Sequence, residues 1–195
     1  MGQEPKLQPK LPAAVIVGIS GGIACYKVAH VVSRLVQADV EVTVLMTEAA
    51  TQFVGPLTFE ALTGRPVYCS PWEQVESHDP QHIKLARAAG LMLIAPATMD
   101  LLAKLVHGRA DDAVSLVASA VDWSRQPLLI APSMNEVMWN QPATRRNVAQ
   151  LEADGCRIIG PAAGWQACRT EGMGRMAEPE TILEAVLSTL PARGL

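Results

Sequence analysis

Short apolar runs alternate along the chain with longer segments whose apolar residues recur at helical spacing. Uninterrupted apolar runs are typical of strands buried on both faces of a parallel sheet, and the longer segments are typical of helices that cover such a sheet. The order of these elements predicts an α/β domain with helices on both faces of a parallel sheet. The predicted strands are Ala14–Ile19, Glu41–Met46, Leu91–Ala95, Leu128–Ala131 and Arg157–Ile159. The predicted helices are Gly22–Val36, a pair within Glu48–Leu62, Met99–Val106, Asp112–Ala120, Ala143–Asp154 and Pro179–Thr189.

The composition is that of a compact protein, with 49% hydrophobic and 18% charged residues among 195. A chain of this length can bury a core of its own, and we expect a single domain over residues 13–195. Residues 1–12 combine prolines with Gln and Lys, and we expect them to form a flexible arm.

Charge and hydropathy argue against several classes of partner. The net charge is −3 and no basic run is present, so we expect no binding to nucleic acid. The apolar runs are much shorter than the roughly 20 residues that cross a bilayer, and the first dozen residues lack the apolar core of a signal peptide. We therefore expect no membrane segment and a cytoplasmic location. The four cysteines show neither zinc-ligand spacing nor a disulfide framework, so no metal site is expected.

Small residues follow each predicted strand, at the edge where open α/β sheets bind their ligands. After the first strand come Ser20, Gly21 and Gly22 at the start of a helix. Glycines let a backbone approach a ligand closely, and the N–H groups of a helix start attract anions. The turn departs from the G-x-G-x-x-G dinucleotide pattern, so a mononucleotide phosphate is favoured. A merely tight strand–helix turn is the alternative.

Three further polar residues follow predicted strands. Thr47 and Thr98 are each more typical of a helix N-cap than of a ligand contact, but beside the glycine turn they indicate a cradle for phosphate and polyol groups. Asn135 lies in the segment PSMNEVMW. Its carboxamide is suited to binding a carboxylate, and it is equally suited to capping a helix whose Met and Trp residues pack in the core.

A glycine-punctuated stretch over residues 164–176 carries Cys168 between Arg169 and Arg175. Long loops without regular structure are typical of lids and binding loops, so we predict a structureless lid that brings this thiol to a ligand. His82, taken alone, is typical of a surface position or a helix start.

These motifs together resemble the flavin mononucleotide-containing cysteine decarboxylases, and the resemblance runs from about Ala14 to Val186. It is carried by the segments SGGIACYK, MTEAATQFVGPLTFEALTG, HIKLARAA, IAPAT, GRADD, PSMNEVMW and ACRTEGMGRMAEP. The fold that it implies is a Rossmann-like or flavodoxin-like α/β domain. The sequence departs from the family's common residues at Ser133, where alanine is frequent, and at Ala88 and Gly90, where tryptophan and aspartate are common.

The resemblance implies a role for individual residues. His82 and Cys168 would be catalytic, with Cys168 on a flap that covers the substrate. Asn135 and Met138 would grip the substrate carboxylate, and Arg87 would lie nearby. The cofactor would be FMN, held by Ser20, Gly21, Gly22, Thr47, Thr98 and Ser133, with Phe53 and the turn Met99–Leu101 lying against it.

The implied activity is decarboxylation of 4′-phospho-N-pantothenoylcysteine to 4′-phosphopantetheine in coenzyme A biosynthesis. The substrate thiol would be oxidised to a thioaldehyde, carbon dioxide would leave to give an enethiol, and the flavin would return the electrons. His82, Asn135 and Cys168 together favour this redox-neutral reaction over two alternatives, an oxidative decarboxylase of a peptide C-terminal cysteine and a flavin-binding regulatory subunit. The resemblance also implies a homo-oligomer (a trimer or an assembly of trimers) and a separate ligase upstream.

Overall fold

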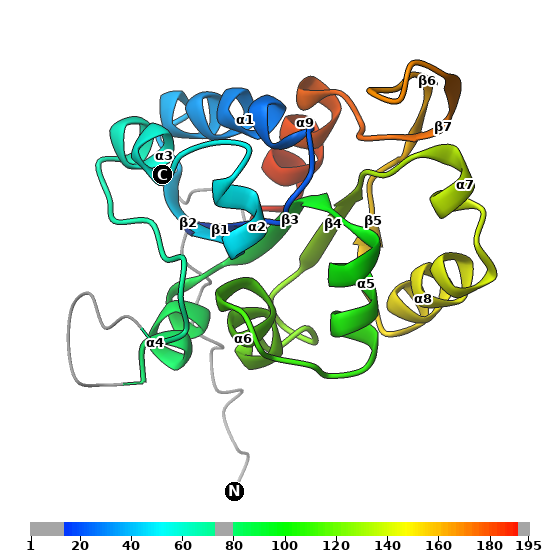
Figure 1. Ribbon diagram of the computed structural model, residues 1–195. Coiled ribbons are helices and arrows are strands. Elements are labelled where there is room, and N and C mark those ends of the chain that lie inside the picture. Colours follow the sequence, from blue (N-terminus) through cyan, green and yellow to red (C-terminus); the bar gives the residue numbers. More distant parts are fainter. Residues whose placement is uncertain (1–13, 73–79, 191–195) are drawn as a thin grey trace, which may run out of the picture.

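Five parallel strands form the central sheet of the computed structural model, which describes residues 14–72 and 80–190 (Figure 1). The strand order is β2-β1-β3-β4-β5, with β1 and β3 in the middle. The strands are β1 (Ala14–Ile19), β2 (Glu41–Met46), β3 (Leu91–Ala97), β4 (Leu128–Pro132) and β5 (Arg157–Ile158). The arm predicted over residues 1–12 lies outside the described residues.

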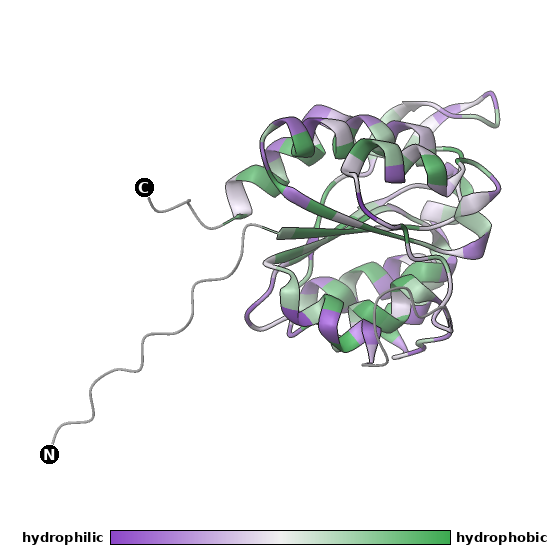
Figure 2. Ribbon diagram, turned by 90° about the vertical axis from the view of Figure 1, so that its left-hand side faces the viewer, coloured by the Kyte–Doolittle hydropathy of each residue, from purple (hydrophilic) through white to green (hydrophobic). Residues whose placement is uncertain are grey.

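Helices cover both faces of the sheet, which lies between two helical layers when seen edge-on (Figure 2). On one side, called the α1 face, are α1 (Cys25–Gln37), α3 (Pro56–Thr63) and α9 (Pro179–Thr189). On the other side, called the α5 face, are α4 (Gln81–Ala88), α5 (Met99–Val106), α6 (Ala113–Ala120) and α8 (Pro142–Ala153). Two short helices, α2 (Glu48–Thr51) and α7 (Glu136–Trp139), follow β2 and β4.

The alternation of side chains along each strand divides the core in two. Val15 and Val17 pack on the α1 face, whereas Ile16 between them packs on the α5 face. In β3, Leu93 belongs to the first cluster and Ile94 to the second. Because successive side chains of a strand point to opposite faces, a strand covered on both sides has to be apolar throughout. The unbroken apolar runs of the sequence therefore reflect this burial.

The predicted doubly covered parallel sheet is confirmed, and so are all five of its strands, with ends that differ by up to two residues. Helices α5 and α9 have the predicted bounds. The first helix begins at Cys25 and not at Gly22, because residues 21–24 form a turn before the helix. Helix α4 was not predicted, since it has only 8 residues, whereas α7 is the helix implied by the capping alternative for Asn135.

The prediction of a structureless loop over residues 164–176 is wrong. Strands β6 (Ala162–Trp165) and β7 (Glu171–Arg175) pair there as an antiparallel hairpin. Glycine is disfavoured inside strands, which is why the sequence favoured a loop, but Gly164, Gly172 and Gly174 lie within these two strands. None of the helices in the described part of the chain combines the length and the apolar character needed to cross a membrane.

Candidate active site

The carboxyl ends of four neighbouring strands are tied together by backbone hydrogen bonds. Thr47 N–H donates to Ile19 O at 3.0 Å, Ser20 N–H to Pro96 O at 3.2 Å, and Ser133 N–H to Ala97 O at 3.0 Å. The turns after β1, β2, β3 and β4 therefore lie side by side at the carboxyl end of the sheet. The predicted residues Ser20, Thr47, Thr98 and Ser133 are brought together there.

Ser20 connects two of these turns through its side chain. The residue is 2% exposed. Its hydroxyl donates to Pro96 O at 2.7 Å and accepts from Thr98 N–H at 2.9 Å. Because both bonds are internal, only the second lone pair of the oxygen is left for a ligand.

The glycine turn is shaped by the approach of α2. A Cβ atom on Gly21 would lie 2.5 Å from Ala49 Cβ and 2.8 Å from the Ala49 carbonyl carbon, so no side chain fits there. On Gly22 a Cβ would meet nothing closer than Thr98 Cγ2 at 3.7 Å. No hydrogen bond found among the described residues uses the N–H groups of Gly21 and Gly22. Unpaired N–H groups just before a helix are suited to an anion such as a phosphate.

Three of the predicted ligand residues are helix N-caps. Thr47 Oγ1 accepts from Ala50 N–H at 3.2 Å, and Thr98 Oγ1 accepts from Leu101 N–H at 3.4 Å. Asn135 Oδ1 accepts from Met138 N–H at 2.9 Å. Capping uses the hydroxyl or carbonyl oxygen, so the Asn135 NH₂ group, which bonds no other described residue, can donate to a ligand.

Leu101 does not fit its prediction as a residue that lies against a flavin. Leu101 is 1% exposed and packs in the core of the α5 face, because it lies on the side of α5 that faces the sheet. Phe53, by contrast, is 50% exposed just after α2. Met138 is 41% exposed on α7. Both of these side chains are accessible to a ligand.

Cys168 lies in the exposed turn of the β6–β7 hairpin, where Arg169 adopts a positive φ of 64°. Its Sγ atom lies 3.0 Å from Thr170 Oγ1 and 3.5 Å from Gln166 Oε1. The hairpin packs against α7, directly after Asn135, and Met134 N–H donates to Gly174 O at 2.9 Å. The structure therefore brings the Cys168 hairpin and the Asn135 turn together. Arg175 forms an ion pair with Glu178.

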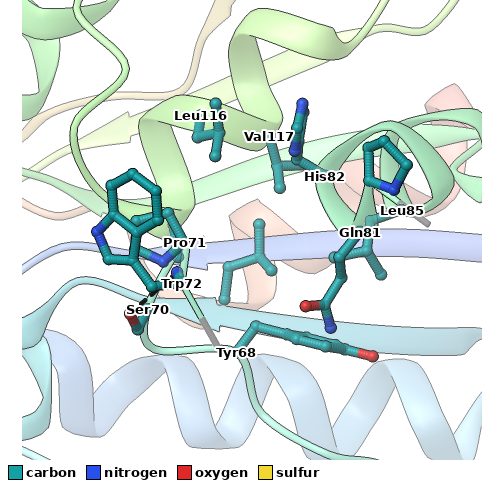
Figure 3. Close-up of a pocket in the computed structure, with 12 residues that line it drawn as sticks. Tyr68, Ser70, Pro71, Trp72, Gln81, His82, Leu85, Leu116 and Val117 are labelled. Atoms are coloured by element: carbon teal, nitrogen blue, oxygen red, sulfur yellow. Dashed lines mark hydrogen bonds between the residues drawn. The ribbon is translucent and has the colours of Figure 1, made fainter. Parts of the chain in front are cut away.

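His82 lies on the side of the sheet bounded by β2, in the first turn of α4. It lines a cavity of about 230 Å³ together with Leu45, Tyr68 and Trp72 (Figure 3). Trp72 is 89% exposed. The cavity adjoins β2, whereas the Cys168 hairpin follows β5, and these strands are the two edges of the sheet. One chain therefore does not bring His82 and Cys168 together.

Arg87 is exposed in the last turn of α4, and the residues after it lead into the amino end of β3. Gly90 N–H donates to Ala14 O, at the start of β1. The structure therefore places Arg87 near the amino ends of the strands, away from the edge that carries Ser20 and Asn135.

Two residues that hold the hairpin, Gln166 and Glu136, were not predicted from the sequence. Their roles depend on contacts between segments about 30 residues apart. The only local signal is a polar side chain, Gln166, in a glycine-rich segment. The GRADD segment likewise forms a cluster in which Lys104 bonds Asp111 at 2.9 Å and Asp112 at 2.8 Å.

Charge and burial set the pKa values of several groups in the domain. Partial burial opposes the charge of Lys104, but the hydrogen bonds to Asp112 and Asp111 outweigh it and raise the pKa of Lys104. The hydrogen bond from Lys104 lowers the pKa of Asp111. Burial raises the pKa of Cys25. Burial, with a contribution from the charge of Asp154, raises the pKa of Cys156 to about 11.

The family model described as Flavoprotein matches residues 3–191. Among curated proteins, the coenzyme A biosynthesis bifunctional protein CoaBC of Vibrio parahaemolyticus serotype O3:K6 is 44% identical over 165 residues. The aligned part is 85% of this chain and 41% of that relative. The chain thus spans about two fifths of the length of the curated relatives that it matches.

Two solved structures share the fold over most of their length. A cysteine-to-serine mutant of PPC decarboxylase, complexed with pantothenoylaminoethenethiol, matches with a TM-score of 0.80 and 28% identity, over 92% of this chain and 98% of that one. The FMN-dependent cysteine decarboxylase SpaF matches with a TM-score of 0.77 and 31% identity, over 91% of this chain and 97% of that one.

Proposed function

This chain belongs to the Flavoprotein family, and from that premise we propose that it is an FMN-dependent decarboxylase of 4′-phospho-N-pantothenoylcysteine, forming 4′-phosphopantetheine. The observation that carries the proposal is the packing of the Cys168 hairpin against the Asn135 turn, at the same carboxyl end of the sheet as the glycine turn after β1. This packing supports a site in which an exposed thiol and a carboxamide lie at the carboxyl ends of the strands, where open α/β sheets bind their ligands.

The residues at this edge fit FMN. The free N–H groups of Gly21 and Gly22 suit its phosphate, and the polar turns at Thr47, Thr98 and Ser133 suit its ribityl chain. The exposed ring of Phe53 suits an aromatic ring system. When bound, FMN supplies the capacity to take up and return two electrons.

The substrate needs this redox capacity because its carboxylate is attached to a carbon without an electron sink. Oxidation of the thiol removes two electrons and two protons and leaves a thioaldehyde, whose C=S bond accepts the electron pair released as carbon dioxide departs. The product of that step is an enethiol. Return of two electrons and two protons then gives the saturated thiol.

Individual residues orient the substrate and move its protons. The Asn135 NH₂ group donates to the substrate carboxylate, and Met138 packs beside it. His82 acts as an acid–base group or holds the carboxylate during oxidation and decarboxylation. The Cys168 thiol donates the proton that the enethiol carbon takes up on reduction. The cysteine-to-serine mutant of PPC decarboxylase, which holds an ethenethiol compound, supports such a role for a cysteine.

A second copy of the chain completes the site in this proposal. His82 and Cys168 lie toward opposite edges of one sheet, so a single substrate can reach both only if they come from different chains. A head-to-tail contact that repeats and closes gives a ring. We propose a trimer, or an assembly of trimers, in which a neighbouring chain supplies His82 and Arg87.

Several further statements belong to the same proposal. The free thiols of Cys25, Cys156 and Cys168 support a reducing compartment, and we place the chain in the cytoplasm. The ligase that joins cysteine to phosphopantothenate is proposed as a separate partner in the pathway. The single domain over residues 13–195 is proposed as the decarboxylase unit.

The test is to incubate the purified holoprotein with 4′-phospho-N-pantothenoylcysteine and to follow product mass and the flavin spectrum. Loss of carbon dioxide alone supports the proposal. Loss of carbon dioxide and two hydrogens indicates an oxidative decarboxylase, and a yellow protein without product refutes decarboxylation of this substrate. Cys168→Ser should complete the oxidative half and stop at the enethiol, and normal turnover would remove Cys168 from the mechanism.

Mixing two inactive variants tests the shared site. His82→Asn and Cys168→Ser subunits, unfolded together and refolded, should regain part of the activity, since some interfaces combine an intact His82 with an intact Cys168. No recovery in mixed oligomers, verified by mass, would mean that each site takes both residues from one chain.

A further inference from the structure

Gln166 is a buried polar residue within an otherwise exposed turn. Gln166 is 7% exposed, whereas Trp165 beside it is 61% exposed and Cys168 is also exposed. A buried carboxamide is stable only when its donors and acceptor are paired. The contacts of Gln166 therefore indicate what this residue holds in place.

The Gln166 carboxamide connects the hairpin to α7. Its Nε2 donates to Met173 O at 3.0 Å and to Gly172 O at 3.3 Å, both on β7. Its Oε1 accepts from Glu136 N–H at 3.2 Å, the residue directly after Asn135. The Cys168 Sγ atom lies 3.5 Å from the same Oε1, within the range of a weak S–H donor. One amide thus contacts the strand, the helix start and the thiol.

The surface opposite Gln166 is fitted to the hairpin. Glu136 Oε1 accepts from Met173 N–H at 3.4 Å. A Cβ atom on Gly172 would lie 2.5 Å from Glu136 Oε2, and one on Gly174 would lie 2.4 Å from Met134 O. No side chain fits at Gly174, because the atom opposite it is backbone, whereas a side chain at Gly172 would push the Glu136 side chain away.

We propose that Gln166 is a positioning residue, whose carboxamide holds the Cys168 thiol over the end of the substrate that Asn135 binds. The inference rests on the proposed function, in which Asn135 binds the carboxylate and Cys168 protonates the enethiol. Gln166 contacts the Cys168 thiol but not the substrate, so it acts through Cys168. It fixes the distance between Cys168 and Asn135, so its loss should slow the reductive half of the reaction selectively.

The experiment is an anaerobic single turnover of holoprotein followed by the flavin absorbance. Gln166→Met keeps a long side chain that can stay buried but removes every hydrogen bond of the amide. The oxidative half, seen as loss of the oxidised flavin spectrum, should proceed within about twofold of the wild-type rate. The return of that spectrum should slow by roughly tenfold, as expected from the loss of one or two net hydrogen bonds. Enethiol should accumulate meanwhile.

A matched control is Gln150→Met on the exposed surface of α8, where the amide donates to Asp154 Oδ1 at 2.8 Å. It should leave both half-reactions unchanged. Gly172→Ala provides a second variant, since the added methyl group pushes against Glu136 while the Gln166 amide is retained. It should show the same selective slowing of the reductive half.

Equal slowing of both half-reactions in Gln166→Met would mean that the residue supports only the fold, and an unchanged reductive half would also overturn the proposal. If the wild type shows neither half-reaction, the proposed function fails. Amide hydrogen exchange over residues 171–175 then tests whether Gln166 holds the hairpin in place. Gln166→Met should accelerate that exchange roughly tenfold, and an unchanged rate overturns the positioning role.

Discussion

Replacing Ser20 by alanine removes a single hydroxyl that joins the turns after β1 and β3. That hydroxyl donates to Pro96 O and accepts from Thr98 N–H, which lie 76 and 78 positions after Ser20 in the sequence. Pro96 O keeps a partner in Ser20→Ala, because the backbone N–H of residue 20 also donates to it at 3.2 Å. Thr98 N–H loses its partner.

The expected cost follows from those two bonds. A net internal hydrogen bond contributes about 0.5–1.5 kcal/mol, and a stranded buried donor costs about 1–3 kcal/mol. Thr98 is only half-buried, so water can reach its N–H in part and the lower end of that range applies. We expect Ser20→Ala to lower the free energy of unfolding by about 2 kcal/mol, or the Tm by roughly 4–8 °C for a domain of this size.

The assay is urea unfolding of the protein freed of flavin, so that cofactor binding does not contribute to stability. Ser119→Ala is the matched control, since its hydroxyl bonds Leu116 O on an exposed part of α6, and its stability should change by less than about 0.5 kcal/mol. A change in Ser20→Ala no larger than in this control would refute the argument. If flavin affinity then fell without any loss of stability, the hydroxyl would instead act as a cofactor ligand.

Two further predictions concern titratable groups. The hydrogen bond from Lys104 lowers the folded-state pKa of Asp111, so its contribution to stability is present above the unfolded value of about 3.9 and is lost as the pH falls through the lowered folded value. The difference in unfolding free energy between wild type and Asp111→Asn should therefore shrink below about pH 4, and a difference that does not depend on pH would contradict this. Iodoacetamide at pH 8 should label the exposed Cys168 well before Cys25 and Cys156, because burial shields these two thiols and raises their pKa, that of Cys156 to about 11. Peptide mass mapping over time measures the order, and equally fast labelling of all three would show that the two buried thiols are accessible.

Local sequence determined the strands and most helices. Burial on both faces demands apolar runs, and Val15, Ile16 and Val17 show that demand directly in their division between two cores. The position of candidate ligand residues also followed from sequence, since residues just after a strand lie at its carboxyl end. Ser20, Thr47, Thr98 and Ser133 do lie along one edge, and for Thr47 and Thr98 the local signal of a helix cap is what the structure shows.

The tertiary structure decided which of these residues meet. Strand order placed the His82 cavity beside one edge of the sheet and the Cys168 hairpin beyond the other, and neither periodicity nor spacing encodes that order. The glycines of β6 and β7 disfavour strands locally, yet the hairpin forms because Gln166 and Glu136 hold it against α7. Such contacts join segments distant in sequence, and their energy depends on packing that no single segment contains. The sequence thus determined the elements and the chemistry that they carry, whereas the three-dimensional arrangement decided where that chemistry is assembled.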